Sequence, residues 1–119
     1  MADYRVKYPR THHFSWSPGR SRDDLVLDGV GHFEAMESVV VTEKLDGENT
    51  TLYRSHSHAR SLDSKSHPSR NWLKAFHATI SYKIPEDVRV CGENVFAQHS
   101  IGYGSLTTYF YVFSIFRNQ

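Results

Sequence analysis

The sequence predicts an α+β fold, in which one helix packs on a mostly antiparallel sheet. Three runs rich in β-branched or aromatic residues predict strands, and they cover residues 39–45, 88–96 and 109–116. One stretch with apolar residues at helical spacing covers residues 70–82. With 119 residues, 39% hydrophobic and 13% aromatic, the chain has enough apolar material for one core, and we expect a single domain over 1–119.

The opening of the chain has only weak signals of regular structure. Proline and glycine punctuate residues 8–19, which is typical of an irregular arm. A short helix is expected within residues 29–37. No run is apolar enough for a signal peptide or for the roughly 20 residues that span a bilayer, so we expect a cytoplasmic protein without a membrane partner.

A hairpin is expected next. Residues Val39–Leu45 are β-branched and apolar, which favours a buried strand. Residues Asp46–Asn49 are typical of a turn, and Thr50–Arg54 predicts a second strand. This arrangement would hold the amine of Lys44 at the rim of a sheet, where a nucleophile has rigid support.

The second half of the chain is predicted to contain one helix and two strands. Ser66 or Ser69 can cap the helix over 70–82, and Pro85 ends it. Residues 88–96 and 109–116 are the predicted strands. Because alternate residues of a strand share a face, one face of the last strand should carry Tyr109, Tyr111, Phe113 and Ile115, and the other Phe110, Val112, Ser114 and Phe116.

Charge and cysteine content restrict the function only weakly. The net charge is +1, but five Lys or Arg residues lie between Arg54 and Lys74 against a single acidic residue, Asp63. Such a segment can meet phosphates, although a solvated loop explains the same count. The single cysteine, Cys91, lies in an apolar stretch and is predicted to be an inert core thiol.

Lys44, Asp46 and Gly47 form a K-x-D-G signature with a possible nucleophile. A lysine amine attacks phosphorus only when it is neutral, and at the ordinary pKa near 10.4 only about one amine in 2,500 is neutral at pH 7. Partial burial, nearby cations or a metal ion would favour the neutral form. The alternative is an ordinary exposed lysine at the end of a strand.

The run Thr42–Tyr53, which contains this signature, resembles the nucleotidyl-lysine motif of the covalent nucleotidyltransferases, and of RNA ligases in particular. Later segments resemble further motifs of these enzymes in the same order: Arg60-Ser61, Gly92-Glu93-Asn94 and the aromatic run 109–115. The resemblance implies an incomplete, ATP-grasp-like nucleotidyltransferase domain. Two later motifs, a Glu-Gly strand and a Lys-x-Lys strand, would lie beyond Gln119, so we expect a truncated domain with little activity alone and a missing C-terminal half or partner chain.

The resemblance implies a role for each matching residue. Lys44 would attack ATP and carry AMP, Asn49 would anchor the turn or contact the outgoing phosphate, and Arg60 would hold phosphate or ribose. The remaining residues would surround the nucleoside: Glu43 and Leu45 beside the base, Glu93 at the ribose hydroxyl and Phe113 stacked on adenine. The implied cofactors are ATP and Mg²⁺, and the partners are RNA ends, a 5′-phosphate and a 3′-hydroxyl.

Other interpretations remain open from the sequence. The chain could be a nonenzymatic nucleotide- or RNA-binding fragment, or a DNA ligase or capping-type nucleotidyltransferase with the same lysine motif. The histidine pairs His12-His13 and His56-x-His58 raise the question of zinc. Without a cysteine pair or four ligands at a recognisable spacing, magnesium carried by ATP is the simpler expectation.

Overall fold

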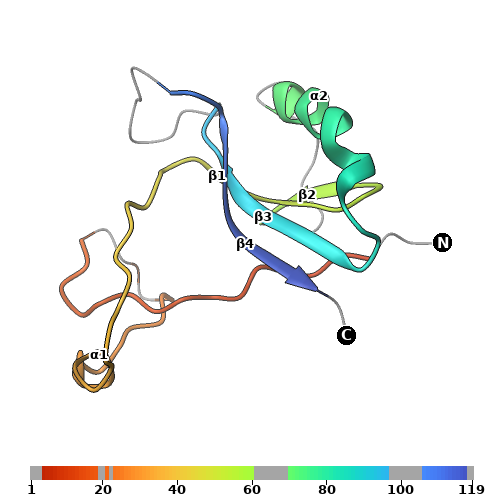
Figure 1. Ribbon diagram of the computed structural model, residues 1–119. Helices are drawn as coiled ribbons and strands as arrows, with labels where there is room; N and C mark the ends of the chain where they lie inside the picture. Colours follow the sequence, from red (N-terminus) through yellow and green to blue (C-terminus); the bar gives the residue numbers. More distant parts are fainter. Residues whose placement is uncertain (1–3, 19–20, 22, 61–69, 97–105, 118–119) are drawn as a thin grey trace. The chain divides into compact units, whose positions relative to one another are not determined.

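The computed structural model describes residues 4–18, 21, 23–60, 70–96 and 106–117 (Figure 1). Contacts divide the chain into two compact units, one formed by Met1–Tyr8 with Lys44–Gln119 and the other by Pro9–Glu43. The first unit contains the sheet and the longer helix, and the second contains a one-turn helix. The elements are α1 (Gly31–Glu34), β1 (Glu48–Leu52), β2 (Ser57–Ala59), α2 (Asn71–Ile80), η2 (Ser81–Lys83), β3 (Val88–Asn94) and β4 (Phe110–Arg117).

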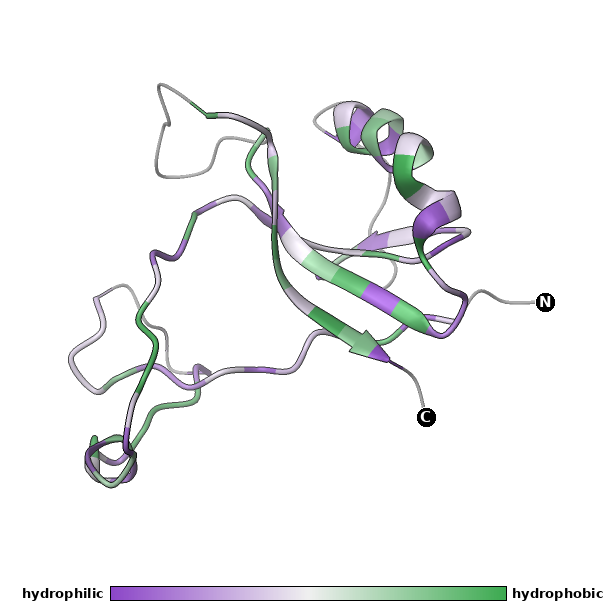
Figure 2. Ribbon diagram, in the orientation of Figure 1, coloured by the Kyte–Doolittle hydropathy of each residue, from purple (hydrophilic) through white to green (hydrophobic). Residues whose placement is uncertain are grey.

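The strands form one sheet in the order β2-β1-β3-β4, and each neighbouring pair is antiparallel. Hydrophobic residues extend along much of β3 and β4 (Figure 2). β3 lies between β1 and β4 and is mostly buried, as expected for an inner strand. These observations confirm the predicted α+β class with an antiparallel sheet and a packed helix.

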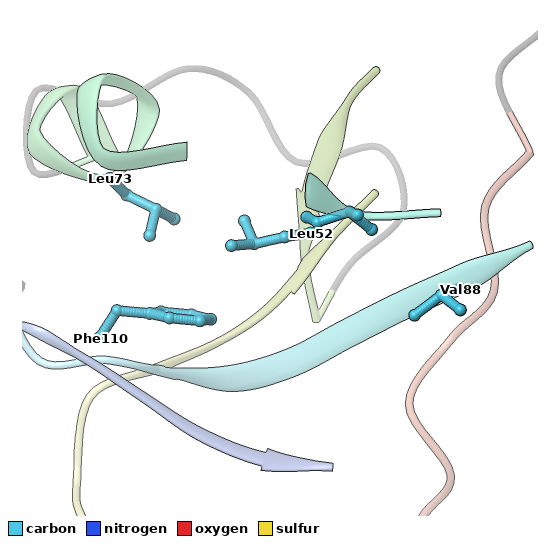
Figure 3. Packing of buried hydrophobic residues seen from close by; sticks show 5 residues of the cluster. Leu52, Leu73, Val88 and Phe110 are labelled. Carbon is cyan, nitrogen blue, oxygen red and sulfur yellow. The ribbon is translucent and has the colours of Figure 1, made fainter. Parts of the chain in front are cut away.

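α2 packs on one face of the sheet, where the core lies. Leu73 of α2 points toward Leu52 of β1 and Phe110 of β4 (Figure 3). Ile84 and Val88 complete the buried cluster. Its margin is formed by partly buried residues at the predicted helical spacing and on β3: Trp72, Phe76, Ile80 and Val90.

The predicted helix over 70–82 is confirmed as α2 followed by η2. Ile84 has an extended backbone, because the ring of the following Pro85 disfavours a helical conformation there. At the other end, Arg70 is the N-cap residue and makes no side-chain capping hydrogen bond. The two serines proposed as caps, Ser66 and Ser69, lie outside the described residues.

The predicted strand over 39–45 is wrong, and so is the turn after it. Val40 and Val41 are 90% and 89% exposed. β-Branched residues favour a strand only where a neighbouring strand can pair, and both edges of β1 are occupied by β2 and β3. Glu48 and Asn49, expected in the turn, already belong to β1. Lys44 therefore lies in an irregular segment that leads into β1, and not at the mouth of a hairpin.

The hairpin that does form joins β1 and β2. Its closing hydrogen bond runs from Tyr53 N–H to the His56 carbonyl at 2.8 Å. The other predicted elements are confirmed with shifted ends: α1 covers only Gly31–Glu34, and β3 and β4 lie within or close to the predicted ranges. The loop expected over 102–105 lies outside the described residues.

The unit formed by Pro9–Glu43 has little buried surface. Its backbone is linked by a parallel bridge between His13 and Val26. Phe14 stacks on Trp16 at 4.8 Å between ring centroids and meets Phe33 edge-on. None of its described residues is fully buried.

Candidate active site

The K-x-D-G segment meets the sheet where β1 begins and β3 ends. Glu48, the first residue of β1, pairs with Asn94, the last residue of β3. A Cβ atom on Gly47 would collide with the backbone carbonyl of Asn94 and lie 3.0 Å from the Cα atom of Val95. Only a residue without a side chain permits this approach. Lys44, earlier in the same segment, is exposed.

A row of polar side chains crosses the sheet directly beside this end. Asn49 of β1 pairs with Glu93 of β3, and Glu93 pairs with Tyr111 of β4. Residues opposite one another in an antiparallel pair project to the same face, with Cβ atoms about 5 Å apart. Two residues that the sequence assigned to nucleotide binding, Asn49 and Glu93, are therefore neighbours, and Tyr111 adds a third group.

Arg60 lies at the end of β2 that is nearer to this row. It directly follows Ala59, the last residue of β2, and Ala59 pairs with Thr50, the neighbour of Asn49 in β1. Arg60 itself is outside the strand and has no partner in the ladder between β1 and β2. Arg60 is exposed, so its guanidinium can reach an oxyanion without first leaving a buried position.

Phe113 occupies a β-bulge in β4. Cys91 pairs with Ser114, but its neighbour Gly92 pairs with Val112, so Phe113 is an extra residue without a partner on β3. A bulge of this kind redirects side chains relative to simple alternation. Phe113 is 46% exposed.

Tyr8 shows where the bulge directs Phe113. The Tyr8 ring contacts Phe113 edge-on at 5.2 Å and Phe116 at 6.1 Å, and its hydroxyl lies 3.4 Å from the Ser114 hydroxyl. All three β4 residues thus lie on one face, which Ser114 shares with Cys91. Strict alternation placed Phe113 and Ser114 on opposite faces, and that prediction is wrong because of the bulge. As a result, Phe113 lies on the face that carries the polar row.

Two amides at this end of the sheet have unsatisfied hydrogen-bonding capacity. Asn49 Oδ1 and Asn94 Nδ2 are buried and have no hydrogen-bond partner. Asn94 Oδ1 is used locally, since it accepts a hydrogen bond from the Phe96 N–H at 3.1 Å. A buried acceptor without a donor is costly, so Asn49 fits a ligand that brings a hydroxyl or amine, such as the ribose or base of a nucleotide.

Further along the same face, residues near the N-terminus contact the sheet. Val6 N–H donates to the Tyr53 hydroxyl at 2.8 Å, and that hydroxyl donates to His58 Nε2 at 3.0 Å. His58 Nδ1–H donates to the Ala59 carbonyl at 2.7 Å, which leaves Nε2 of a neutral imidazole to accept from the Tyr53 hydroxyl. The histidine pair considered for zinc is therefore used in packing: His58 is buried in this chain, and His56 stacks on Tyr53 at 4.2 Å.

Burial shifts the ionisation of several groups on this face. It lowers the pKa of His58 below its usual 6.5, and the positive charge of Arg5 adds to the effect. It raises the pKa of Tyr53 and of the Cys91 thiol. Cys91 is fully buried, which confirms its predicted place in the core, and its raised pKa disfavours the reactive thiolate.

Arg70 has a structural partner near the signature. Its guanidinium binds the Glu48 carboxylate through two hydrogen bonds of 2.8 and 2.6 Å, with both side chains 21% exposed. This pairing raises the pKa of Arg70. Arg70 was counted among the basic residues that could meet phosphate, but it ties the start of α2 to the start of β1. Residues 61–69 of that basic segment lie outside the described part.

Leu45 and Glu43, the residues expected beside the base, belong to different units of the chain. Leu45 is half-buried in the unit that contains the sheet. Glu43 is the last residue of the other unit, so it is not assigned a position relative to the row. Lys44 is the residue at which the chain re-enters the sheet-containing unit after Pro9–Glu43.

The described residues do not form a protein cage for a metal. Among them, no group of three or more His, Cys, Asp or Glu side chains could hold an ion. Mg²⁺ commonly keeps several waters and binds through substrate phosphates rather than through a cage of protein ligands.

Comparison with known proteins decides the family. A profile of the family described as RNA ligase matches residues 37–119, most of the chain. The chain belongs to the RNA ligase family. Searches of curated proteins and of solved structures found no match. Membership supports a ligase that acts on RNA, at the level of the family. None of the described helices of this RNA ligase family member is long and apolar enough to cross a membrane.

The sequence missed several groups around the row. Tyr111 was recognised only as part of an aromatic run, and its place beside Glu93 depends on strand register. Tyr8 was assigned to an irregular arm, and its contact with Phe113 joins segments far apart in the chain. The Glu48–Arg70 pair had one available signal, a carboxylate directly after the signature, but no sequence spacing identifies its partner.

Proposed function

We propose that the chain is the adenylyltransferase part of an ATP-dependent RNA ligase, with Lys44 as the residue that carries AMP. The observation that supports this most directly is the row Asn49–Glu93–Tyr111 beside the end of the sheet that Gly47 contacts. Family membership supplies the RNA substrate. The row supplies polar groups for a nucleoside within reach of the signature.

In the first step, the neutral amine of Lys44 attacks the α-phosphorus of ATP. A phosphorus–nitrogen bond forms, the bond to the bridging oxygen breaks, pyrophosphate leaves, and the proton of the amine passes to water. Bound Mg²⁺ would neutralise part of the charge on the phosphates. Arg60 would bind a phosphate or ribose oxygen through its planar fork of donors.

The nucleoside would lie along the row. The Glu93 carboxylate accepts a hydrogen bond from a ribose hydroxyl. Asn49 Oδ1, which is buried without a partner, accepts a hydrogen bond from a second donor of the nucleoside. Phe113, held in the bulge, stacks on adenine. Leu45 and Glu43 are the proposed neighbours of the base on the lysine segment.

The later steps transfer AMP to RNA and then release it. An oxygen of the RNA 5′-phosphate attacks the same phosphorus, the bond to Lys44 breaks, and the amine takes up a proton. A 3′-hydroxyl then attacks the activated 5′-phosphate, a phosphodiester bond forms, AMP leaves, and the hydroxyl proton passes to solvent.

The test is covalent labelling with ATP that carries the label on its α-phosphorus, in the presence of Mg²⁺. We expect a label that Lys44→Ala abolishes and that Lys83→Ala, at an exposed lysine of η2, leaves intact. In the described part of the chain, Lys44 is exposed and has no ion pair, so further cations are needed to favour its neutral form. We therefore expect a weak label on these 119 residues and a stronger one on a version extended by a Lys-x-Lys strand.

Other outcomes separate the remaining functions. A Lys44-dependent label from GTP but not from ATP would favour a capping-type enzyme. Sealing of DNA nicks in preference to RNA would favour a DNA ligase. If ATP binds but no Lys44-dependent label forms on the extended version, the catalytic proposal is wrong and a nonenzymatic nucleotide-binding module takes its place.

A further inference from the structure

Three aromatic side chains form a partly exposed cluster at one end of the sheet. Trp72 lies near the start of α2, Phe96 shortly after β3 and Tyr109 directly before β4. The Trp72 and Phe96 rings are nearly parallel, with centroids 6.1 Å apart and 11° between their planes. Tyr109 stands edge-on to both, at 5.3 Å from Trp72 and 5.2 Å from Phe96. We call these three residues the aromatic cluster.

The cluster is not explained by packing of the core alone. Phe110, which fills the core beside α2, is 5% exposed, whereas Phe96 is 45% and Tyr109 41% exposed. Aromatic rings contribute most to stability when they are fully removed from water. The three rings contact one another, and part of the Phe96 and Tyr109 surface remains accessible.

Its position relates it to the signature. The Gly47 backbone packs against the Asn94 carbonyl and the Cα atom of Val95, the residue that precedes Phe96. Val95 N–H also donates to the Tyr109 carbonyl at 2.9 Å. The aromatic cluster and the K-x-D-G segment therefore contact the same few residues at the end of β3.

We propose that the aromatic cluster is a stacking platform for unpaired bases of the RNA strand that is being joined. The choice of RNA as occupant rests on the proposed function, and the choice of stacking rests on the rings. Bases stack on exposed aromatic rings with little dependence on sequence. Arg70, two residues before Trp72 in the chain, is bound to Glu48, so the proposed contact is base stacking on the rings and not a phosphate contact with this guanidinium.

Trp72 can report on binding directly. The chain has two tryptophans, Trp16 and Trp72, so Trp16→Phe leaves Trp72 as the single indole. We expect a short single-stranded oligoadenylate to quench its fluorescence in the absence of ATP. We also expect Phe96→Leu and Tyr109→Leu, in the same background, to weaken binding by about tenfold each, since base stacking has effects of this size. Circular dichroism and the protection of the buried Cys91 thiol would verify folding of each variant.

The matched control is Tyr82→Leu, which alters an exposed aromatic residue of η2, beyond the other end of α2. It should leave RNA binding unchanged. An oligonucleotide of the same length without bases should quench weakly or not at all. Equal binding of the abasic strand, no RNA binding, or unchanged binding in both cluster variants would overturn the platform.

The two proposals fail separately. RNA quenching of Trp72 that persists in Lys44→Ala, together with no AMP label on the extended version, would retain the platform and remove the ligase mechanism. A Lys44-dependent label without cluster-dependent RNA binding would do the reverse.

Discussion

Gly47 is the residue at which the K-x-D-G signature is fixed to the sheet. The atoms that a Cβ would meet belong to the backbone of Asn94 and Val95, and backbone atoms of an inner strand cannot move aside as a flexible side chain would. The glycine of the signature is therefore explained by close approach. Its neighbours Leu45 and Asp46 are half-buried beside it.

We expect Gly47→Ala to lower the free energy of unfolding by about 1–3 kcal/mol, the usual cost of forcing an extra methyl group into a packed site. Urea denaturation followed by circular dichroism would measure it. Gly31→Ala is the control, because a Cβ at Gly31 meets nothing within 4 Å. A Gly47→Ala protein as stable as the control would show that the signature segment does not pack against the end of β3.

His58 gives the chain a specific pH dependence. Burial lowers its pKa in the folded state below the value of 6.5 expected when unfolded, so the unfolded chain binds the proton more readily. The stabilisation from this neutral imidazole is complete above pH 6.5 and is lost as the pH falls from 6.5 toward the folded pKa. The urea midpoint should therefore decrease over that interval.

Replacement of the imidazole tests this assignment. His58→Gln should reduce the slope of stability against pH below 6.5, while His32→Gln, at an exposed histidine, should leave the slope unchanged. Tyr53→Phe, which removes the hydroxyl between Val6 N–H and His58, should lower stability at neutral pH by about 1 kcal/mol. An identical slope in His58→Gln would assign the pH dependence to other groups.

At the scale of elements, the position of α2 depends on a charged contact as well as on the core. The bidentate pair between Glu48 and Arg70 is 21% exposed on each side, so solvent screens it only partly. Arg70→Lys keeps the charge but loses the fork of donors. We expect it to lower the free energy of unfolding by about 1 kcal/mol, and Arg70→Ala by about 1–3 kcal/mol.

The chain contains an exposed ion pair that serves as control. Arg117 and Asp87 lie 3.6 Å apart and are 72% and 53% exposed. Arg117→Lys should therefore change stability by no more than a few tenths of a kcal/mol. Equal effects at the two sites in urea denaturation would contradict the anchoring role of Arg70.

The elements also show what sequence can and cannot predict. The helix over 70–82 was found because its apolar spacing and Pro85 determine it locally. The strand over 39–45 was wrong because strand formation depends on a partner that propensity does not reveal. Residues Asn49, Glu93 and Phe113 were named from motifs. Their common face depends on register and on the bulge, which arise from pairing between distant segments.

At the scale of the whole molecule, burial is distributed unequally between the two units. Every fully buried residue among those described belongs to the unit that contains the sheet. The other unit, Pro9–Glu43, is held by the His13–Val26 bridge and a few ring contacts. Because apolar burial is the main source of stability, the two units should differ in the free energy needed to open them.

Native-state hydrogen exchange would measure that difference. The His13 and Leu27 amides donate to the Leu25 and His13 carbonyls and report on the smaller unit. The Val95 amide, bonded to Tyr109, and the buried Cys91 thiol report on the sheet. We expect the His13 and Leu27 amides to exchange through an opening whose free energy is lower, by roughly 2 kcal/mol or more, than that of the opening that exposes the Val95 amide. Thiol reagents should reach Cys91 only through the opening of higher free energy. Equal opening free energies at all these positions would mean that the two units unfold as one cooperative body, and the unequal burial would not set their stabilities.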